Sequence, residues 1–495
     1  MTAIDTSDLG LDLTMDLLAE LPTVRMDFRT IGQTTPTKQS PPSPSPMQSC
    51  DSTYASARPS ASRSAPRGWL YSLLRHPRMM PYNRLAIAVV LLNLGYLCFG
   101  GSEVGPIFAH GLNAANVLNV AFVNVVVAII IRQPYVINLL FGLATRAPKT
   151  WPLSVRWALG KVYHFGGIHV GAFFSATMWL GLYTAMNLLS DAPSAPPHVV
   201  ALSAIHVILL GVMILVALPK ARAEKHNRFE RTARFGTWAS LALLWAQVVL
   251  LADASRDTST LSLALIASPK TWALALATLS VALPWFYLRR VKVDVETPSS
   301  HVAIATFDYG VTPFAGSSTE ISRSPLLEWH PFANIPAPNR SGFRLAISRA
   351  GDWTSKFIED RPSHVWVKSI PTAGVGHVER LFKRVVWIAT GSGVGPCVPH
   401  LLTGEVPARL VWSTKNPRQT FGDALVDEIL TAEPEARIWN TGTQGKPDLV
   451  ALALEAYEDF NAEAVICIAN KKVTWDVVYA LERRGIPAFG AIWDS

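Results

Sequence analysis

The chain predicts a multi-pass α-helical membrane domain followed by two water-soluble domains, first a small antiparallel β-barrel and then an α/β domain with a parallel sheet. Three observations predict this fold class: six apolar segments before residue 291, short alternating runs after it, and alternating strand-like and helix-like segments from about residue 380. With 49% hydrophobic and 16% charged residues among 495, the composition also excludes a lone globular core.

Residues 1–66 predict a disordered tail. From about Thr34 to Arg67 the chain is rich in serine and proline, and this composition cannot bury enough apolar surface to offset the entropy of ordering. The first basic residue is Arg25, unlike the basic start of a secretory signal. The serines of the tail are candidate phosphorylation sites, and an unregulated tether is the alternative.

Residues 67–290 predict six membrane spans, because most of the apolar segments reach the roughly 17 to 25 residues needed to cross a bilayer. The segments are Leu85 to Gly101, Ala114 to Ile131, Val162 to Leu188, Val199 to Leu218, Phe235 to Leu251 and Thr271 to Leu288. Tyr135 to Ala147 is shorter, and we expect an interfacial or re-entrant helix there.

The charges of the connections set the expected orientation. Basic clusters precede the first segment and follow the second, fourth and sixth, so the positive-inside rule places both termini in the cytosol. Much of the net charge of +8 is then explained by topology and by contact with anionic lipids of the bilayer, and we expect no nucleic-acid partner. The span lengths leave the plasma membrane and secretory-pathway membranes both open.

Two soluble domains are expected after the last span. In residues 291–378, runs such as His301 to Phe307 and Phe343 to Arg349 alternate in polarity between Gly, Pro and Ser clusters, which predicts the antiparallel barrel. In residues 379–495, strand-like and helix-like segments alternate, as in a parallel sheet with crossover helices. The strand candidates are Val385 to Ala389, Ala408 to Trp412, Ala436 to Trp439 and Ala464 to Ala469, and the helix candidates are Asp423 to Leu430 and Val473 to Arg484.

A glycine-rich turn follows the first strand of the α/β domain and contains Gly391, Gly393, Gly395 and Pro396. Glycines allow backbone amides to approach phosphate oxygens, and the N-terminus of a following helix favours an anion. The turn therefore predicts a nucleotide-phosphate site. By contrast, the four cysteines, Cys50, Cys98, Cys397 and Cys467, show neither metal-ligand spacing nor a secreted pattern, so we expect no metal site and no disulfide framework.

Two more motifs precede this turn. Trp329-His330-Pro331-Phe332-Ala333-Asn334 comes first, and Phe343-Arg344 to Gly351-Asp352-Trp353-Thr354 comes second. In this order and spacing, the three motifs resemble those of ferredoxin-reductase-type modules in the ferric reductase and NADPH oxidase superfamily. The resemblance implies an FAD-binding barrel at 291–378 and an NAD(P)-binding domain at 379–495.

The resemblance also implies roles for single residues. In the family, the stretch matching His330, Pro331 and Phe332 lines the flavin ring and ribityl chain, and the second motif, with Arg344, Gly351, Trp353 and Thr354, leads to the flavin pyrophosphate. The stretch matching Gly391 to Pro396 lies under the nicotinamide nucleotide, and Trp493 stands where such reductases often stack an aromatic residue on the flavin. FAD and NADPH, or NADH, are the implied cofactors.

Several positions depart from the family pattern. Ala333 lacks the usual hydroxyl, the turn before the nucleotide domain is reduced to Ser369 to Gly376, and the late Cys-Gly-Pro motif is replaced after Cys467. The last change bears on hydride transfer, which requires nicotinamide and flavin in near-contact. Lys415 and Arg418 are candidate partners of a 2′-phosphate and would favour NADPH, or they are solvated surface charges.

The helical part lacks the paired haem ligands of the family. Relatives hold two haems with histidine pairs fourteen residues apart, which returns to one helix face roughly 21 Å along the axis. Here Val155 stands fourteen residues before His169, and Gly236 stands near the second expected position. This argues against haem held by histidine pairs. His169, with His206 on the next segment, remains a haem-ligand candidate, and a helix–helix hydrogen bond is the alternative for a lone histidine.

Missing haem ligands make the chain similar to the fungal TmpA-type transmembrane oxidoreductases, which are associated with development and with secondary-metabolite or siderophore gene clusters. The first hypothesis is a membrane-anchored enzyme that passes reducing equivalents from NAD(P)H through FAD to an unknown acceptor on the cytosolic side. The second is a catalytically weak redox or nucleotide sensor, or a scaffold that binds a membrane or pathway protein partner. A transporter is disfavoured because the spans lack intramembrane charges, and helix–helix hydrogen bonds account for Asn93, Asn119 and Asn124.

Overall fold

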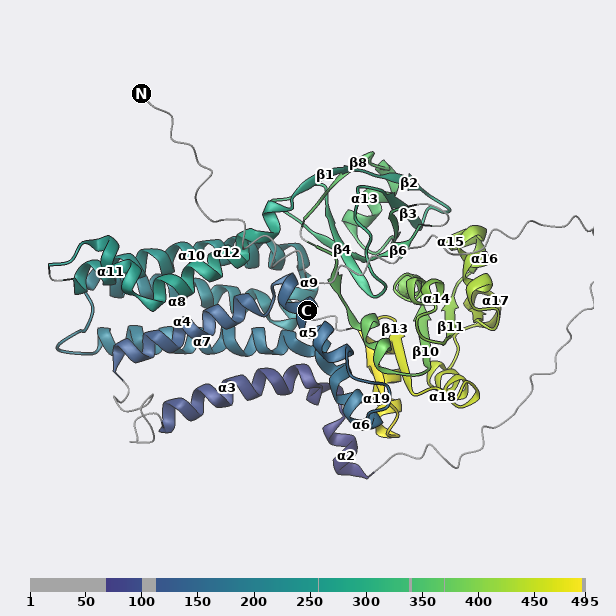
Figure 1. Cartoon of the computed structure of the whole chain (residues 1–495), viewed down its shortest axis with the longest axis horizontal. Helices are drawn as coiled ribbons and strands as arrows, with labels where there is room; N and C mark the ends of the chain where they lie inside the picture. The colour runs from purple at the N-terminus through teal and green to yellow at the C-terminus, as the bar shows by residue number, and fades with distance from the viewer. Residues whose placement is uncertain (1–67, 100–112, 257, 338–340, 369, 492–495) are drawn as a thin grey trace, which may run out of the picture. The chain divides into compact units, whose positions relative to one another are not determined.

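The computed structural model describes residues 68–99, 113–256, 258–337, 341–368 and 370–491. The predicted tail at 1–66 and the predicted flavin partner Trp493 lie outside these residues. Helices occupy the first part of the chain and strands begin at Arg289 (Figure 1). The helices and both kinds of sheet belong to one compact unit within Pro59–Ser495.

Within the described residues, helices form in each of the six segments that the apolar pattern predicts. The helices are α2 (Trp69–Leu74), α3 (Pro81–Phe99), α4 (Ala114–Ile130), α5 (Pro134–Thr145), α6 (Leu153–Leu159), α7 (Gly166–Leu188), α8 (Pro197–Ala217), α9 (Pro219–Glu224), α10 (His226–Ser255), α11 (Leu261–Ala267) and α12 (Pro269–Phe286), with 3-10 turns η1 (Pro77–Met79) and η2 (Gly160–Phe165). In the described residues, four helices are long and apolar enough to cross a membrane, and six if each bent helix pair is one span.

The bent pairs explain the shorter helices. The helix α5 turns by 75° from α4, and α12 turns by 76° from α11. The first bend corresponds to the predicted interfacial or re-entrant helix. One face of α5 packs inside the protein, because Phe141 is 1% exposed and Asn138 hydrogen-bonds both Pro371 O and Ala373 N in the barrel domain, whereas Leu139 and Leu143 on the same helix are exposed.

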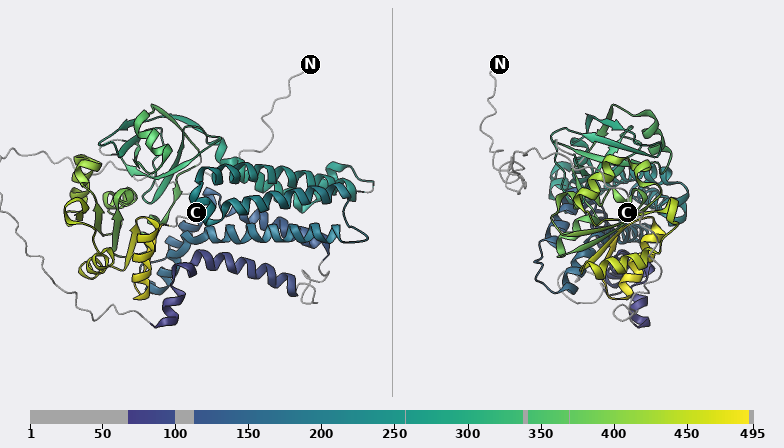
Figure 2. Two further views of the ribbon diagram at one scale, coloured as in Figure 1. Left: turned by 180° about the vertical axis from the view of Figure 1, so that it is seen from behind. Right: turned by 90° about the vertical axis from the view of Figure 1, so that its right-hand side faces the viewer.

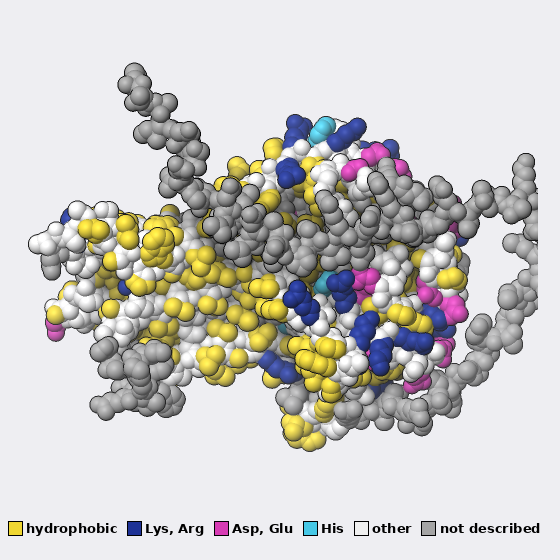
Figure 3. Space-filling view, in the orientation of Figure 1, with side chains coloured by type: hydrophobic (Ala, Val, Ile, Leu, Met, Phe, Trp, Pro, Cys, Tyr) yellow, Lys and Arg dark blue, Asp and Glu magenta, His cyan; other side chains and the backbone are white. Residues whose placement is uncertain are grey.

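Polar side chains inside the helical bundle bond to one another. Asn93 on α3 and Asn124 on α4 exchange amide hydrogen bonds of 3.2 and 2.7 Å, and the Trp179 indole donates to Asn93 Oδ1 at 2.8 Å. The expected helix–helix role of Asn93 and Asn124 is therefore confirmed. On the face that Figure 3 shows, hydrophobic side chains are spread over the helical bundle with few charged ones among them, while charged side chains gather over the strands and their helices.

Two antiparallel sheets form the domain that follows. One has the order β1-β8-β4-β5 with β9 paired to β4, and the other has the order β2-β3-β7-β6. The elements are β1 (Arg289–Lys292), β2 (Asp294–Glu296), β3 (Val302–Phe307), β4 (Ser317–Ser322), β5 (His330–Ala333), β6 (Ile335–Pro336), β7 (Phe343–Ser348), α13 (Asp352–Asp360), β8 (His364–Val367) and β9 (Thr372–Ala373). Alternate residues of β3 and β7, such as Ala305 and Leu345, are fully buried between the sheets.

The α/β prediction is confirmed. All four predicted strands pair in one parallel sheet of order β12-β11-β10-β13-β14, and helices cover both of its faces (Figure 2). The elements are η3 (Val375–Leu381), β10 (Val385–Thr390), η4 (Gly391–Val394), α14 (Val398–Thr403), β11 (Ala408–Thr414), α15 (Pro417–Phe421), α16 (Asp423–Ala432), β12 (Arg437–Asn440), α17 (Thr441–Gln444), α18 (Leu449–Asp459), β13 (Ala464–Ile468), α19 (Lys471–Arg483) and β14 (Ala488–Gly490).

Basic residues of the second connection bind the α/β domain. The buried Arg156 guanidinium donates to Glu463 at 2.6 and 3.1 Å and to Leu381 O at 2.9 Å. Lys161 donates to Glu482 at 2.5 Å. These charges therefore hold two parts of the chain together, a role beyond the topological one that their sequence position predicts.

Candidate functional site

The glycine turn lies where the strand order of the parallel sheet reverses. The central strand β10 pairs with β11 on one side and with β13 on the other. In open α/β sheets, ligands bind outside the carboxyl ends of the strands at this switch point. The turn η4 follows β10 directly, so the sequence-predicted phosphate motif occupies the expected ligand position of the sheet.

Close approach at the turn requires a glycine at one position. A Cβ added to Gly393 would lie 2.0 Å from the carbonyl oxygen of Ile468, at the end of β13. Gly391 has φ +51, and its carbonyl accepts a hydrogen bond of 2.9 Å from the Trp412 indole, which fixes the turn to β11. The turn is thus held against both neighbours of β10.

The same turn adjoins the second predicted motif. A Cβ added to Gly395 would lie 3.6 Å from the Cβ of Ala346 in β7, an ordinary contact distance. Pro396 is half-buried and continues the turn toward α14. Because β7 carries Arg344, the structure brings the second and third motifs together.

Aromatic rings join the first motif to the second. The His330 ring in β5 stacks on Trp353 of α13 with ring centroids 4.2 Å apart, and Phe332 stacks on the same indole at 6.1 Å. The Trp353 indole donates to Glu328 at 2.5 Å. Pro331, between the two rings in sequence, is exposed and lies opposite Glu320 of β4.

The start of α13 is capped from within. The hydroxyl of Thr354 accepts hydrogen bonds from the amides of Ala350 and Gly351, at 2.9 and 3.1 Å. These amides stand where the resemblance places the flavin pyrophosphate. A phosphate there would have to displace the Thr354 hydroxyl from them.

Arg344 connects the two domains. Its guanidinium donates to both carboxylate oxygens of Glu428 on α16, each at 2.9 Å, and to Pro336 O at 3.0 Å. The pair is mostly buried, with the Arg344 and Glu428 side chains 11% and 19% exposed. Sequence reasoning predicted Arg344 as a flavin contact and did not identify this carboxylate partner.

The two candidate 2′-phosphate partners differ in availability. Lys415 is exposed just after β11, whereas Arg418 forms ion pairs of 3.0 and 2.7 Å with Asp423 and Asp427. The hydrogen bonds that Arg418 donates to the carboxylates of Asp427 and Asp423 raise its pKa. Lys415 is therefore the better placed of the two for a phosphate.

Cys467 does not face the turn. It is fully buried in the apolar cluster that also contains Val477 and Leu481 of α19. Burial raises the pKa of the Cys467 thiol to about 12, and the pKa of the buried Cys397 thiol is also raised well above its ordinary value. Both thiols therefore stay protonated at neutral pH, so neither is a reactive thiolate.

A buried polar cluster beneath the turn was missed by sequence reasoning. His400 of α14 lies 2.5 Å from Glu379 and stacks on Trp387 of β10 with ring centroids 4.5 Å apart. A Cβ added to Gly376 would lie 2.5 Å from His400 Nε2, so this cluster also fixes the turn that ends at Gly376. The signal was a histidine inside the apolar run Cys397 to Leu402.

The candidate haem histidine has a protein partner. His169 Nδ1 forms a 2.8 Å hydrogen bond with Ala128 O of α4. His206 is 1% exposed, and its ring nitrogens have no hydrogen-bond partner among the described residues. Within those residues, no three His, Cys, Asp or Glu side chains gather as a metal site.

Comparisons with known proteins point to reductases. Residues 375–495 match the family model "Adenylate-forming reductase 03009, C-terminal domain". The adenylate-forming reductases 03009 and 06235 of Coprinopsis cinerea are 43% and 41% identical over 433 residues, or 87% of this chain. The chain spans only 42% of the length of each relative. These matches support a relationship to reductases, but they do not support the more specific resemblance to TmpA-type or ferric reductases.

Solved structures that resemble part of this chain include ferredoxin-NADP+ reductases. One from Neisseria gonorrhoeae with bound FAD and NADP is 13% identical, with 41% of this chain and 98% of that chain covered and a TM-score of 0.35. One from Plasmodium falciparum is 12% identical, with 42% and 96% covered and a TM-score of 0.34.

Proposed function

We propose that this chain is a membrane-anchored oxidoreductase that passes reducing equivalents from NAD(P)H through FAD to an acceptor on the cytosolic side. The observation that carries the proposal is the position of the glycine turn: it lies at the switch point of the parallel sheet, and it contacts the strand that bears Arg344. A nucleotide at the turn and a flavin on the barrel would therefore meet at one boundary.

The turn fits a nucleotide because its backbone is held close to β13 with no side chain in between. Gly393 leaves no room for a Cβ, so only glycine lets the turn lie this close to the carboxyl end of β13, at the edge of the sheet where a phosphate would bind. Lys415, at the end of β11, is the residue that we propose selects NADPH by pairing with its 2′-phosphate.

The barrel has side chains of the types that bind a flavin, although several of these groups already form hydrogen bonds within the protein. His330, Phe332 and Trp353 supply ring faces, and Arg344 supplies a guanidinium. FAD, when bound, accepts a hydride and releases electrons to the acceptor. Binding of its pyrophosphate requires Arg344 to exchange Glu428 for phosphate, and it requires Thr354 to release the amides at the start of α13.

Membrane anchoring is supported by the apolar surface of the long helices. Large side chains are exposed on α3, α4 and α8, where Leu92, Val123 and Ile208 are 74%, 61% and 67% exposed. A lipid environment accounts for such exposure along span-length helices. We propose that both termini face the cytosol, that the acceptor is reduced there, and that lipid and a pathway protein are the partners.

The relatives support reduction as the chemistry, because each is described as a reductase. The resemblance to TmpA-type and ferric reductases enters this proposal only through the order of the motifs, and reduction of iron is not proposed. The processes that we propose it serves are development, secondary metabolism or siderophore biosynthesis.

The test is a spectrum of the full chain purified in detergent. We expect bound flavin with visible absorbance that NADPH bleaches without oxygen. Protein that takes up no FAD would overturn the enzyme proposal and favour the sensor or scaffold. Protein with flavin that neither NADPH nor NADH reduces would overturn the nucleotide half alone.

A matched pair of variants tests the flavin half. Arg344→Gln should weaken FAD binding at least about 10-fold, because a hydrogen bond to a charged group contributes roughly 1.5 to 3 kcal/mol. Glu428→Gln releases the same guanidinium, and FAD affinity should be unchanged or higher. If Glu428→Gln weakens FAD binding as much as Arg344→Gln, the ion pair is structural and Arg344 is not a flavin ligand.

A further inference from the structure

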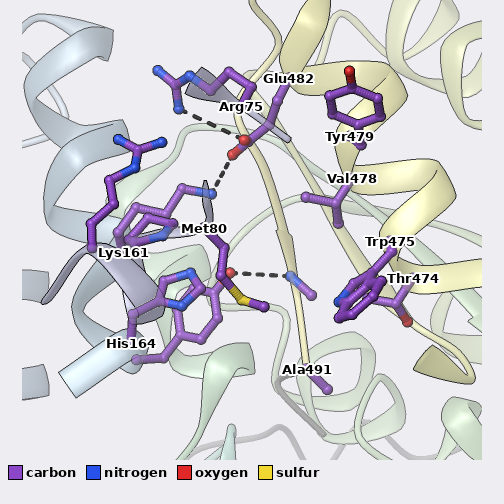
Figure 4. Close-up of a pocket in the computed structure, with 14 residues that line it drawn as sticks. Arg75, Met80, Lys161, His164, Thr474, Trp475, Val478, Tyr479, Glu482 and Ala491 are labelled. Atoms are coloured by element: carbon purple, nitrogen blue, oxygen red, sulfur yellow. Dashed lines mark hydrogen bonds and ion pairs between the residues drawn. The ribbon is translucent and has the colours of Figure 1, made fainter. Parts of the chain in front are cut away.

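We propose that a pocket between the start of the helical bundle and α19 binds a phosphate group. The pocket is a small cavity of about 50 Å³. On one side its walls come from Arg75, Met80, α3 and η2, and on the other side they come from α19 and the end of β14 (Figure 4). None of the residues of the glycine turn lines it.

Cationic groups dominate the lining. Arg75, Arg84 and Lys161 line the pocket together with a single carboxylate, Glu482. Arg75 and Lys161 share that carboxylate, at 3.7 and 2.5 Å (Figure 4). Positive charges gathered around one carboxylate favour a further anion, and phosphate accepts several charge-assisted hydrogen bonds from such groups.

A buried histidine provides the second observation. His164 is 4% exposed and lines the pocket beside Lys161. Its Nδ1 has no hydrogen-bond partner among the described residues. Since buried polar atoms in proteins are normally hydrogen-bonded, an atom of this kind in a cationic pocket indicates a ligand that forms a hydrogen bond with it.

The cationic end of the pocket lies away from the proposed nucleotide site. Thr474 and Glu482 both line the pocket from α19, and eight residues of helix separate them by about 12 Å. Thr474 is close to the end of β14, near the carboxyl edge of the sheet, whereas Glu482 is at the far end of α19. The phosphate proposed here is therefore not the one at the glycine turn.

Two span-length helices begin at the pocket. Pro81 starts α3, and Lys161 and His164 lie in η2, directly before α7, within the helical stretch Leu153–Leu188 that is long and apolar enough to cross a membrane. Under the proposed topology, these ends lie at the cytosolic surface of the membrane. The phosphate has two possible sources there, an anionic lipid headgroup or a soluble phosphate.

Thermal unfolding of the full chain distinguishes the sources. In detergent, inorganic phosphate should raise Tm relative to chloride at equal ionic strength if a soluble phosphate binds. In nanodiscs, adding phosphatidic acid to phosphatidylcholine should raise Tm if the lipid binds. No rise with either probe would overturn the proposal, and neither result depends on flavin or NADPH turnover.

Variants assign the effect to the pocket. Arg75→Gln and Arg84→Gln should each reduce the Tm rise at least by half, and the second serves if the first does not fold. Arg483→Gln removes the same charge from α19, but Arg483 bonds Ser72 and does not line the pocket, so this variant should keep the full rise. An equal loss in all three variants would show a general charge effect and overturn the site.

Discussion

Substitution of Gly393 by alanine tests the geometry of the glycine turn. The added Cβ would lie 2.0 Å from Ile468 O and 2.9 Å from the carbonyl carbon, and neither atom belongs to a flexible side chain. A carbon–oxygen contact needs more than 3 Å, so the turn must move from β13 by about 1 Å. Overpacking of this kind costs about 3 kcal/mol, which corresponds to a fall in Tm of roughly 6 to 12 °C.

The same displacement should slow hydride transfer, since a misplacement of about 1 Å costs roughly 100-fold in rate. The assay is anaerobic bleaching of the bound flavin by NADPH in a stopped-flow instrument, alongside thermal unfolding. Gly395→Ala is the matched control: its Cβ would have neighbours at 3.4 and 3.6 Å and φ is −50, so stability should change by less than about 0.5 kcal/mol. Unchanged Tm and bleaching in Gly393→Ala would refute the reasoning.

Three further predictions concern charges outside the proposed spans. Glu463→Gln should lower stability by about 3 kcal/mol in thermal unfolding, because it leaves the buried Arg156 without a carboxylate, and a loss under 1 kcal/mol would contradict this. Burial, with Arg380 nearby, lowers the pKa of His377 to about 4, so the neutral imidazole stabilises the fold above pH 6.5. The free energy of unfolding should therefore fall by up to about 3 kcal/mol as the pH decreases from 6.5 to 4. His377→Gln should flatten this slope, and an unchanged slope would assign it to other groups. Lys415→Gln should raise KM for NADPH about 10-fold without affecting NADH, whereas Arg418→Gln, already bridged by two aspartates, should have a smaller effect; equal effects would assign the 2′-phosphate to neither.

Local patterns predicted the parallel sheet well. The strands β10, β11, β12 and β13 are apolar runs bounded by charged or small residues, and each lies within one or two residues of its predicted limits. The strand β5 was not predicted, because Pro331 interrupts its pattern; it is accommodated where the strand pairs on one side only, with β4.

Side-chain contacts between residues far apart in the chain could not be predicted from the sequence. The partners Arg344 and Glu428 are 84 residues apart, and His400 and Glu379 are 21 apart, so no periodicity links them. The orientation of Cys467 depends on which sheet face α19 covers, which only the fold decides. The need for glycine at position 376 likewise depends on the fold, because His400 occupies the space that a side chain there would need.

The pairing of Arg156 with Glu463 has a consequence for biogenesis under the proposed topology. The two residues are 307 positions apart, so at a synthesis rate of roughly 5 to 20 residues per second the arginine emerges about 15 to 60 s before the glutamate. During that interval its charge is available to orient the nascent helices, and afterwards the same charge anchors the folded α/β domain. Arg156 would thus orient the helices during membrane insertion and later bind the α/β domain. Its mutation would impair helix orientation and domain assembly as two separate defects.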